Sequence, residues 1–121
     1  LGRTPGVAHA ACSFATDHLE VHYDPTATSP DRIKAAVACV PPLLNESYGP
    51  ASPIDYSWGI GDTPFLLLMG RQDTMYDVGH VEASYRAYIE RPTTRLIWYD
   101  QGHKLTPVYV PDALAWIQAH V

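Results

Sequence analysis

The second half of the chain alternates between apolar strands and amphipathic helices, and this alternation restricts the fold more than any other feature. Residues 65–69 are all apolar, as in a parallel strand that is covered on both faces. Residues 78–90 have helical spacing, residues 95–99 form the next expected strand, and Pro111 begins a last helix. This order predicts a right-handed crossover and two parallel strands. The apolar residues expected on the inner faces of the two helices are Val81, Tyr85 and either Tyr88 or Ile89, then Leu114, Trp116 and Ile117.

In the first part of the chain, residues 18–23 alternate between polar and apolar side chains, which predicts a strand with one solvent-facing side. Ser29 and Pro30 suit a helix N-cap and first helical position, so a helix is expected up to residue 40. Residues 33–40 are also compatible with a buried strand, and periodicity does not decide between the two for so short a run.

A proline-rich stretch, residues 41–62, connects an N-terminal block, residues 1–40, to the strand–helix–strand–helix block, residues 63–121. The length of 121 residues fits one domain, so the two blocks are expected to form a single compact unit. The predicted fold class is α/β, with a small, mainly parallel sheet and flanking helices.

Charge and hydropathy exclude several functional classes. The net charge of −5 argues against nucleic-acid binding, and no apolar run approaches the roughly 18–20 residues of a membrane span. The chain begins with Leu and has no signal-like start, which suggests a processed, trimmed or excerpted chain. Cys12 and Cys39 are expected as buried free thiols, and the expected location is the cytoplasm.

Two polar residues follow the two predicted strands of the second block. Asp73 follows the first strand and His103 follows the second. Because parallel strands end at the same edge of a sheet, both side chains are expected at the edge where open α/β sheets bind ligands. A carboxylate bound to one imidazole nitrogen fixes the tautomer and leaves the other nitrogen to take a proton. The pair therefore has the parts of a general base.

These segments resemble the C-terminal end of an α/β-hydrolase. Residues 63–73 read Thr-Pro, an apolar strand and Gly-Arg-Gln-Asp, residues 99–103 end in Gly-His, and residues 112–117 are similar to the closing helix of that family. The similarity covers about half of the chain, from about Thr63 to Val121. It implies that Asp73 is the acid and His103 the base of a catalytic triad.

The nucleophile of that family lies in a Gly-x-Ser-x-Gly turn upstream of the acid, and this chain has no such turn. Residues 2–6 have the two glycines, with Thr4 at the nucleophile position, so Thr4 is a candidate nucleophile. This segment departs from the pattern because no strand precedes it and because Pro5 lacks the N–H of an oxyanion donor. The other hydroxyls and thiols considered are Cys12, Ser13, Cys39, Ser47 and Ser57.

The N-terminal third also resembles a truncated heavy-metal-associated domain, a small ferredoxin-like module. The similarity rests on residues 5–7, 13–16, 21–25, 29–30 and 33–37. The Cys-x-x-Cys loop that binds metal in that family is absent, so no metal ligand follows from this resemblance. In a competing interpretation, residues 6–18 are the helix after a hydrolase nucleophile turn, residues 31–37 are a sheet strand, and the hydrolase similarity begins at Asp31.

Histidine, cysteine and glutamate are frequent in the first block. His18, Glu20 and His22 share one strand face, with His9 and Cys12 nearby in the sequence. Two histidines four residues apart on a strand are about 13 Å apart, too far for one ion without other partners. No metal site and no cofactor are therefore predicted.

The function expected from the sequence is a minimal or truncated hydrolase that cleaves small ester-like substrates weakly, with Asp73 and His103 as its catalytic pair. The attacking group would be a serine, threonine, cysteine or water. Two alternatives stay open: a non-catalytic scaffold or a join of two unrelated fragments, and a metal-binding module that uses the N-terminal His and Cys residues. A half-sheet exposes a strand edge, so a homodimer is expected.

Overall fold

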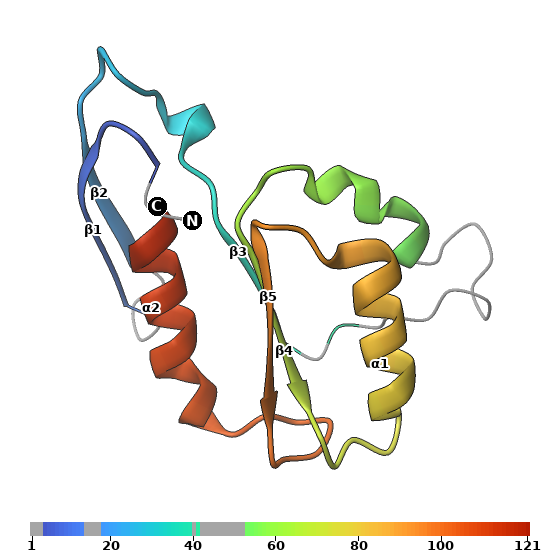
Figure 1. Ribbon diagram of the computed structural model, residues 1–121. Helices are drawn as coiled ribbons and strands as arrows, with labels where there is room; N and C mark the ends of the chain where they lie inside the picture. Colours follow the sequence, from blue (N-terminus) through green and yellow to red (C-terminus); the bar gives the residue numbers. More distant parts are fainter. Residues whose placement is uncertain (1–3, 14–17, 40, 42–52) are drawn as a thin grey trace.

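The structure is a computed structural model, and it describes residues 4–13, 18–39, 41 and 53–121 of the chain. Its central sheet is parallel, with the strand order β3 (Ala36–Cys39), β4 (Phe65–Gly70) and β5 (Thr94–Tyr99). Helix α1 (Val78–Ser84) lies against one face of this sheet and α2 (Val110–His120) against the other (Figure 1). The predicted α/β class and the parallel pairing of the strands are confirmed.

The middle strand, β4, has side chains in both halves of the core. Leu66 and Leu68 pack on the α2 side, and Leu67 and Met69 pack on the α1 side. All four residues are fully buried, as expected for a continuous apolar run in a strand with helices on both faces. The burial of β4 fixes the position of the loop that follows it.

The helical segment after β4 begins at its N-cap Asp77, whose carboxylate accepts from the N–H of His80 at 3.0 Å. Helix α1 continues as one π-helical turn over Tyr85–Ile89. Val81, Tyr85 and Ile89 are buried, whereas Tyr88 is exposed, so Ile89 is the inner residue of the last turn. The predicted extent of this segment, residues 78–90, is close to the observed one.

The N-terminal block forms a second sheet, an antiparallel hairpin of β1 (Val7–Ser13) and β2 (His18–Tyr23). The strand expected at residues 18–23 is confirmed. The helix of the competing interpretation, residues 6–18, is wrong, because residues 7–13 pair with β2 instead of forming internal helical hydrogen bonds. Helix α2 lies between this hairpin and the parallel sheet (Figure 1), and Ala10 of β1 is buried.

The segment after the hairpin contains a short 3-10 turn, Pro30–Arg32, and then β3. The longer helix expected there is wrong, and the strand alternative is correct. Ala36 donates its N–H to the Pro64 carbonyl at 2.8 Å, and β3 then pairs with the buried strand β4. This pairing satisfies the backbone and covers one edge of β4, which an isolated helix would not do.

The proline-rich connection includes a 3-10 helix, η3 (Pro53–Ile60), and its residues 42–52 lie outside the described residues. Cys39 is a free thiol and is exposed, so the expectation that it is buried is wrong. It ends β3 at an edge of the sheet, where a side chain remains open to solvent. Among the residues that the structure describes, no helix has the length and apolar character of a membrane span.

Candidate active site

The loops that follow β4 and β5 are joined by backbone hydrogen bonds. The N–H of Arg71 donates to the carbonyl of Tyr99 at 2.8 Å, and the N–H of Gln72 donates to the carbonyl of Gln101 at 3.0 Å. These bonds continue the ladder of the two strands beyond their last residues. Asp73 and His103 therefore extend from two loops that are fixed relative to each other.

Gly70, the last residue of β4, is the point of closest approach between these loops. A Cβ atom on Gly70 would lie 2.3 Å from the carbonyl oxygen of Gln101 and 2.4 Å from that of Gly102. Both obstacles are backbone atoms, so no side-chain rotation relieves the contact. Only glycine lets the loop after β5 cross the end of β4 this closely.

The loop that carries His103 is braced by Gln101 and Thr106. The side-chain oxygen of Gln101 accepts from the Thr106 N–H at 2.7 Å, and its amide nitrogen donates to the Thr106 hydroxyl at 2.5 Å. This double contact closes the segment between the two residues into a compact turn. His103 lies within that turn, which limits how far its backbone can move.

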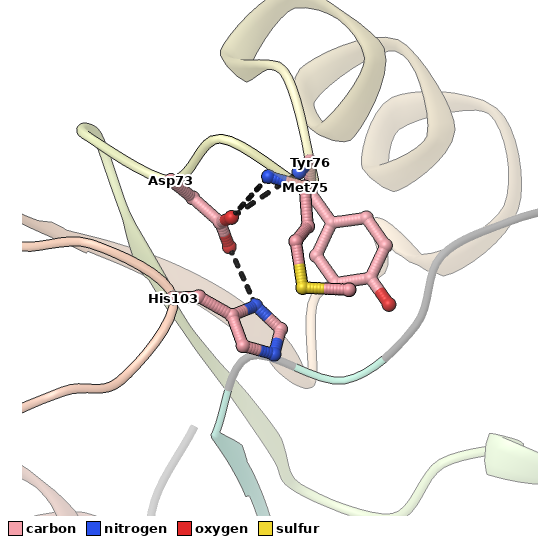
Figure 2. Close-up of polar contacts among 4 residues, drawn as sticks. All are labelled: Asp73, Met75, Tyr76 and His103. Atoms are coloured by element: carbon pink, nitrogen blue, oxygen red, sulfur yellow. Dashed lines mark hydrogen bonds and ion pairs between the residues drawn. The ribbon is translucent and has the colours of Figure 1, made fainter.

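Asp73 directs its carboxylate into a set of donors. One oxygen, Oδ1, accepts the N–H groups of Met75 at 2.7 Å and Tyr76 at 3.3 Å. The other oxygen, Oδ2, lies 3.1 Å from Nδ1 of His103, a contact drawn as a dashed line in Figure 2. The Asp73 side chain has 0% of its surface exposed. The backbone thus fixes one oxygen of the carboxylate and presents the other to the histidine.

The same donors determine the charge on Asp73. Burial raises the pKa of its carboxyl group, but hydrogen bonds from the Met75 N–H, from His103 and from the Tyr76 N–H together lower it further. The net result is an Asp73 pKa below its ordinary value, so the carboxylate is ionised near neutral pH. An ionised carboxylate is the form that accepts a proton-bearing Nδ1 of the imidazole.

His103 is held on one side and open on the other. Its side chain is 45% exposed, and its ring lies 5.5 Å from the buried ring of Tyr76, centroid to centroid. Figure 2 shows Nε2 turned away from Asp73. Because an ionised carboxylate only accepts, Nδ1 carries the proton in the pair, and Nε2 has a free lone pair. Nε2 makes no hydrogen bond to any residue of the described segments.

The structure does not bring Thr4 to this pair. Its hydroxyl donates to the carbonyl of His120 at 3.1 Å, at the last turn of α2. His103 precedes the first turn of the same helix, and the 11 residues of α2 span roughly 16 Å. Thr4 therefore lies at the C-terminal end of α2, whereas His103 lies in the segment that leads to its N-terminal end.

The other candidate nucleophiles also lack a contact with His103 in the described part of the chain. Cys39 ends β3, and the partial desolvation of its sulfur raises the pKa of its thiol, which disfavours the reactive thiolate. Ser57 lies in η3, where its carbonyl accepts from Arg91. The side chains of Cys12 and Ser13, and all of Ser47, lie outside the described residues.

Sequence reasoning missed the groups that hold the pair in place. Met75 and Tyr76 bind the Asp73 carboxylate through their backbone N–H groups. The only sequence signal for this Asx-type turn is an Asp two or three residues before the donors. Gln101 and Thr106 have no recognisable motif. Within the described residues, no group of three or more His, Cys, Asp or Glu side chains is arranged to hold a metal ion.

Comparisons of the chain with protein-family models, with curated proteins and with solved structures found no match. The chemistry of the site therefore has to be inferred from its own geometry.

The close approach at Gly70 leads to a first prediction. Replacing Gly70 with Ala is expected to push the loop after β5 away from β4, because the new Cβ meets two backbone oxygens. The variant should be less stable by about 1–3 kcal/mol, the usual cost of overpacking. Urea unfolding measures this loss.

The matched control is Gly59→Ala in η3, where a Cβ meets nothing within 4 Å. Equal stability of the two variants would contradict the crossing described above.

The lowered pKa of Asp73 leads to a second prediction, about stability at acid pH. Because the folded pKa lies below the unfolded value of about 3.9, the ionised carboxylate stabilises the fold above that pH. This contribution is lost as the pH falls through the folded pKa. The difference in unfolding free energy between the parent and Asp73→Asn should therefore shrink between pH 5 and pH 2.

Asp100→Asn is the matched control, because it removes the same charge from a side chain that is 86% exposed. Its unfolding free energy should stay close to that of the parent over the same range. A difference for Asp73→Asn that is constant from pH 5 to pH 2 would mean that the carboxylate gains nothing from its hydrogen bonds.

Proposed function

We propose that this protein is a weak hydrolase of small ester-like substrates, in which Asp73 and His103 act together as a general base. The observation that carries the proposal is the contact of 3.1 Å between Asp73 Oδ2 and His103 Nδ1, with the carboxylate fully buried and the imidazole half exposed. The resemblance of residues 63–121 to the end of an α/β-hydrolase supports the same roles.

The geometry suits proton transfer at one defined atom. Asp73 orients the ring of His103 and stabilises the positive charge that forms when Nε2 takes a proton. The His103 side chain is 45% exposed, so a water molecule and a substrate can approach the ring from solvent. A positioned histidine base of this kind contributes about 10²–10⁴-fold to the rate of proton transfer.

Water is the attacking group in this proposal. Thr4 lies at the far end of α2, and no described hydroxyl or thiol bonds to His103. His103 would remove a proton from water as the water oxygen attacks the ester carbonyl. The proton would then pass from Nε2 to the leaving alcohol as the carbon–oxygen bond breaks. This route needs no covalent intermediate.

The surroundings of the pair favour an apolar acyl group. Met75, whose N–H binds Asp73, has a side chain that is 63% exposed. Tyr76 belongs to the hydrophobic core, and its ring contacts the imidazole from the core side. A short aliphatic acyl chain could cover Met75 while its carbonyl faces Nε2. Short-chain esters are therefore the substrate class to test first.

One observation favours a second candidate, a non-catalytic α/β scaffold. No side-chain hydroxyl or thiol of the described residues bonds to His103. Asp73 uses the N–H groups of Met75 and Tyr76 for itself. In this case the pair would only fasten the loop after β5 to the loop after β4.

A third prediction separates the two candidates. The parent is expected to hydrolyse p-nitrophenyl acetate, and His103→Ala is expected to lower kcat/KM at least about tenfold by removing the base. Asp73→Asn should lower it less, because the imidazole remains but is no longer oriented. The change in absorbance of released p-nitrophenol measures the rate.

Imidazoles that solvent can reach hydrolyse such esters by themselves, so His80→Ala, which removes a partly exposed histidine of α1, is the control and should stay within about twofold of the parent. A chelator should leave the rate unchanged. Equal rates for the parent, His103→Ala and Asp73→Asn would refute the hydrolase proposal. A folded parent with no turnover above buffer would support the scaffold.

The cellular setting and assembly of the chain are part of the same proposal. The cytoplasmic location stays a prediction, and the free thiol of Cys39 fits a reducing compartment. A homodimer is proposed because β3 is an edge strand, and no strand in the described segments pairs with its outer side. A second copy could cover that edge by strand pairing.

A fourth prediction tests this assembly. In size-exclusion chromatography with light scattering, the parent should elute at twice the monomer mass. Val37→Pro in β3 should shift it toward the monomer, if the outer edge carries the pairing, because proline has no N–H. Leu96→Pro in β5, where the N–H also points away from β4, is the matched change and tests whether general destabilisation explains the result. A parent of monomer mass at all concentrations would count against the dimer.

A further inference from the structure

The solvent-facing side of the β1–β2 hairpin brings together two histidines that are far apart in the sequence. His9 of β1 is the direct cross-strand partner of His22 of β2, and Ala11 is the partner of Glu20. Directly opposed residues on antiparallel strands point to the same face. His9, His22 and Glu20 are all exposed, whereas the neighbouring Ala10 is buried. The two imidazoles therefore share the outer face of the hairpin.

The spacing of the two rings is close to the spacing that one metal ion requires. Their centroids are 5.6 Å apart, with the ring planes at 83°. Two imidazoles on a tetrahedral zinc, with Zn–N bonds of about 2.0–2.1 Å, have ring centres roughly 5 Å apart. A small side-chain rotation is enough to turn one nitrogen of each ring toward a common point. The strands themselves do not have to move.

Glu20 holds one of these rings in a form that suits a metal ligand. Its Oε1 lies 2.5 Å from Nε2 of His22. Because the carboxylate accepts, this contact places the ring proton on Nε2 and leaves the lone pair on Nδ1. Histidines that bind metals commonly donate their other N–H to a carboxylate, which fixes the ring and strengthens the ligand. The Glu20–His22 contact has this arrangement before any ion is bound.

We propose that His9 and His22 form a surface site for one divalent transition-metal ion, such as Zn²⁺ or Cu²⁺, with Glu20 as the positioning residue. The site has two protein ligands, and water completes the coordination. The described segments contain no group of three or more His, Cys, Asp or Glu side chains that could hold an ion. A site with two protein ligands is compatible with this finding. Imidazole ligands favour Cu²⁺ and Zn²⁺ over Mg²⁺, which prefers oxygen.

The sequence places His9 and His22 among several possible ligands but does not pair them. His9 and His22 are 13 residues apart, and only the register of the hairpin shows that they face each other. The Cα atom of His18, the other histidine of β2, is about 13 Å from that of His22 along the strand. This separation makes His18 a matched control on the same strand.

A fifth prediction tests the site by isothermal titration of the full chain with ZnCl₂ and with CuCl₂. The parent should bind one ion of either metal per chain, with Cu²⁺ tighter than Zn²⁺. His9→Gln and His22→Gln should each weaken binding at least about tenfold, since one ligand is lost. Glu20→Gln should weaken it about tenfold by releasing the orientation of His22. His18→Gln should bind as the parent does.

Circular dichroism checks that each variant keeps the parent fold, and the Co²⁺-loaded protein gives a spectroscopic signature of the site. That spectrum should change in Glu20→Gln even at saturating Co²⁺, which a purely structural role of Glu20 would not produce. Parent-like affinity in His9→Gln or His22→Gln would overturn the proposal. The proposal would also be overturned if His18→Gln lost as much metal affinity as His22→Gln, or if the parent bound no metal ion. None of these outcomes depends on ester hydrolysis.

Discussion

The crossing of the loop after β5 over Gly70 is the constraint on which the candidate site depends. The carbonyls of Gln101 and Gly102 occupy the space that a side chain at position 70 would need. This contact and the two backbone hydrogen bonds beside it set the distance between the loops. The buried carboxylate of Asp73 then meets the imidazole at hydrogen-bond distance without depending on side-chain flexibility. The polar pair thus rests on backbone packing, which is less easily altered than a network of side chains.

The parts of the structure that followed from the sequence are those with long or unbroken patterns. The run from Phe65 to Met69 is entirely apolar, which predicts a strand buried on both faces. The helical spacing after it predicts a helix that crosses over to a parallel strand. Two parallel strands predict the proximity of Asp73 and His103 from topology alone, and the contact between the two side chains confirms it. The conformations of the loops do not enter this prediction.

The remaining parts depend on contacts between segments that are distant in the sequence. Residues 36–39 form a strand because β4 is available to pair with them, and a run of Ala, Val and Cys has no pattern of its own that shows this. Residues 7–13 are a strand for the same reason, with β2 as the partner. The N–H groups that bind Asp73, and the opposition of His9 and His22, are features of turn geometry and register. Residue types alone do not specify either.

Helix α2 has a consequence for how the chain loses structure. It packs on the parallel sheet through Ala113 and Trp116 and on the hairpin from its other side (Figure 1). The amides of α2 can therefore exchange with solvent only when at least one of two interfaces has opened. We expect the hairpin, whose strands are close in the sequence, to open before the buried strand β4. Helix α2 would then be the boundary between two units of unequal stability.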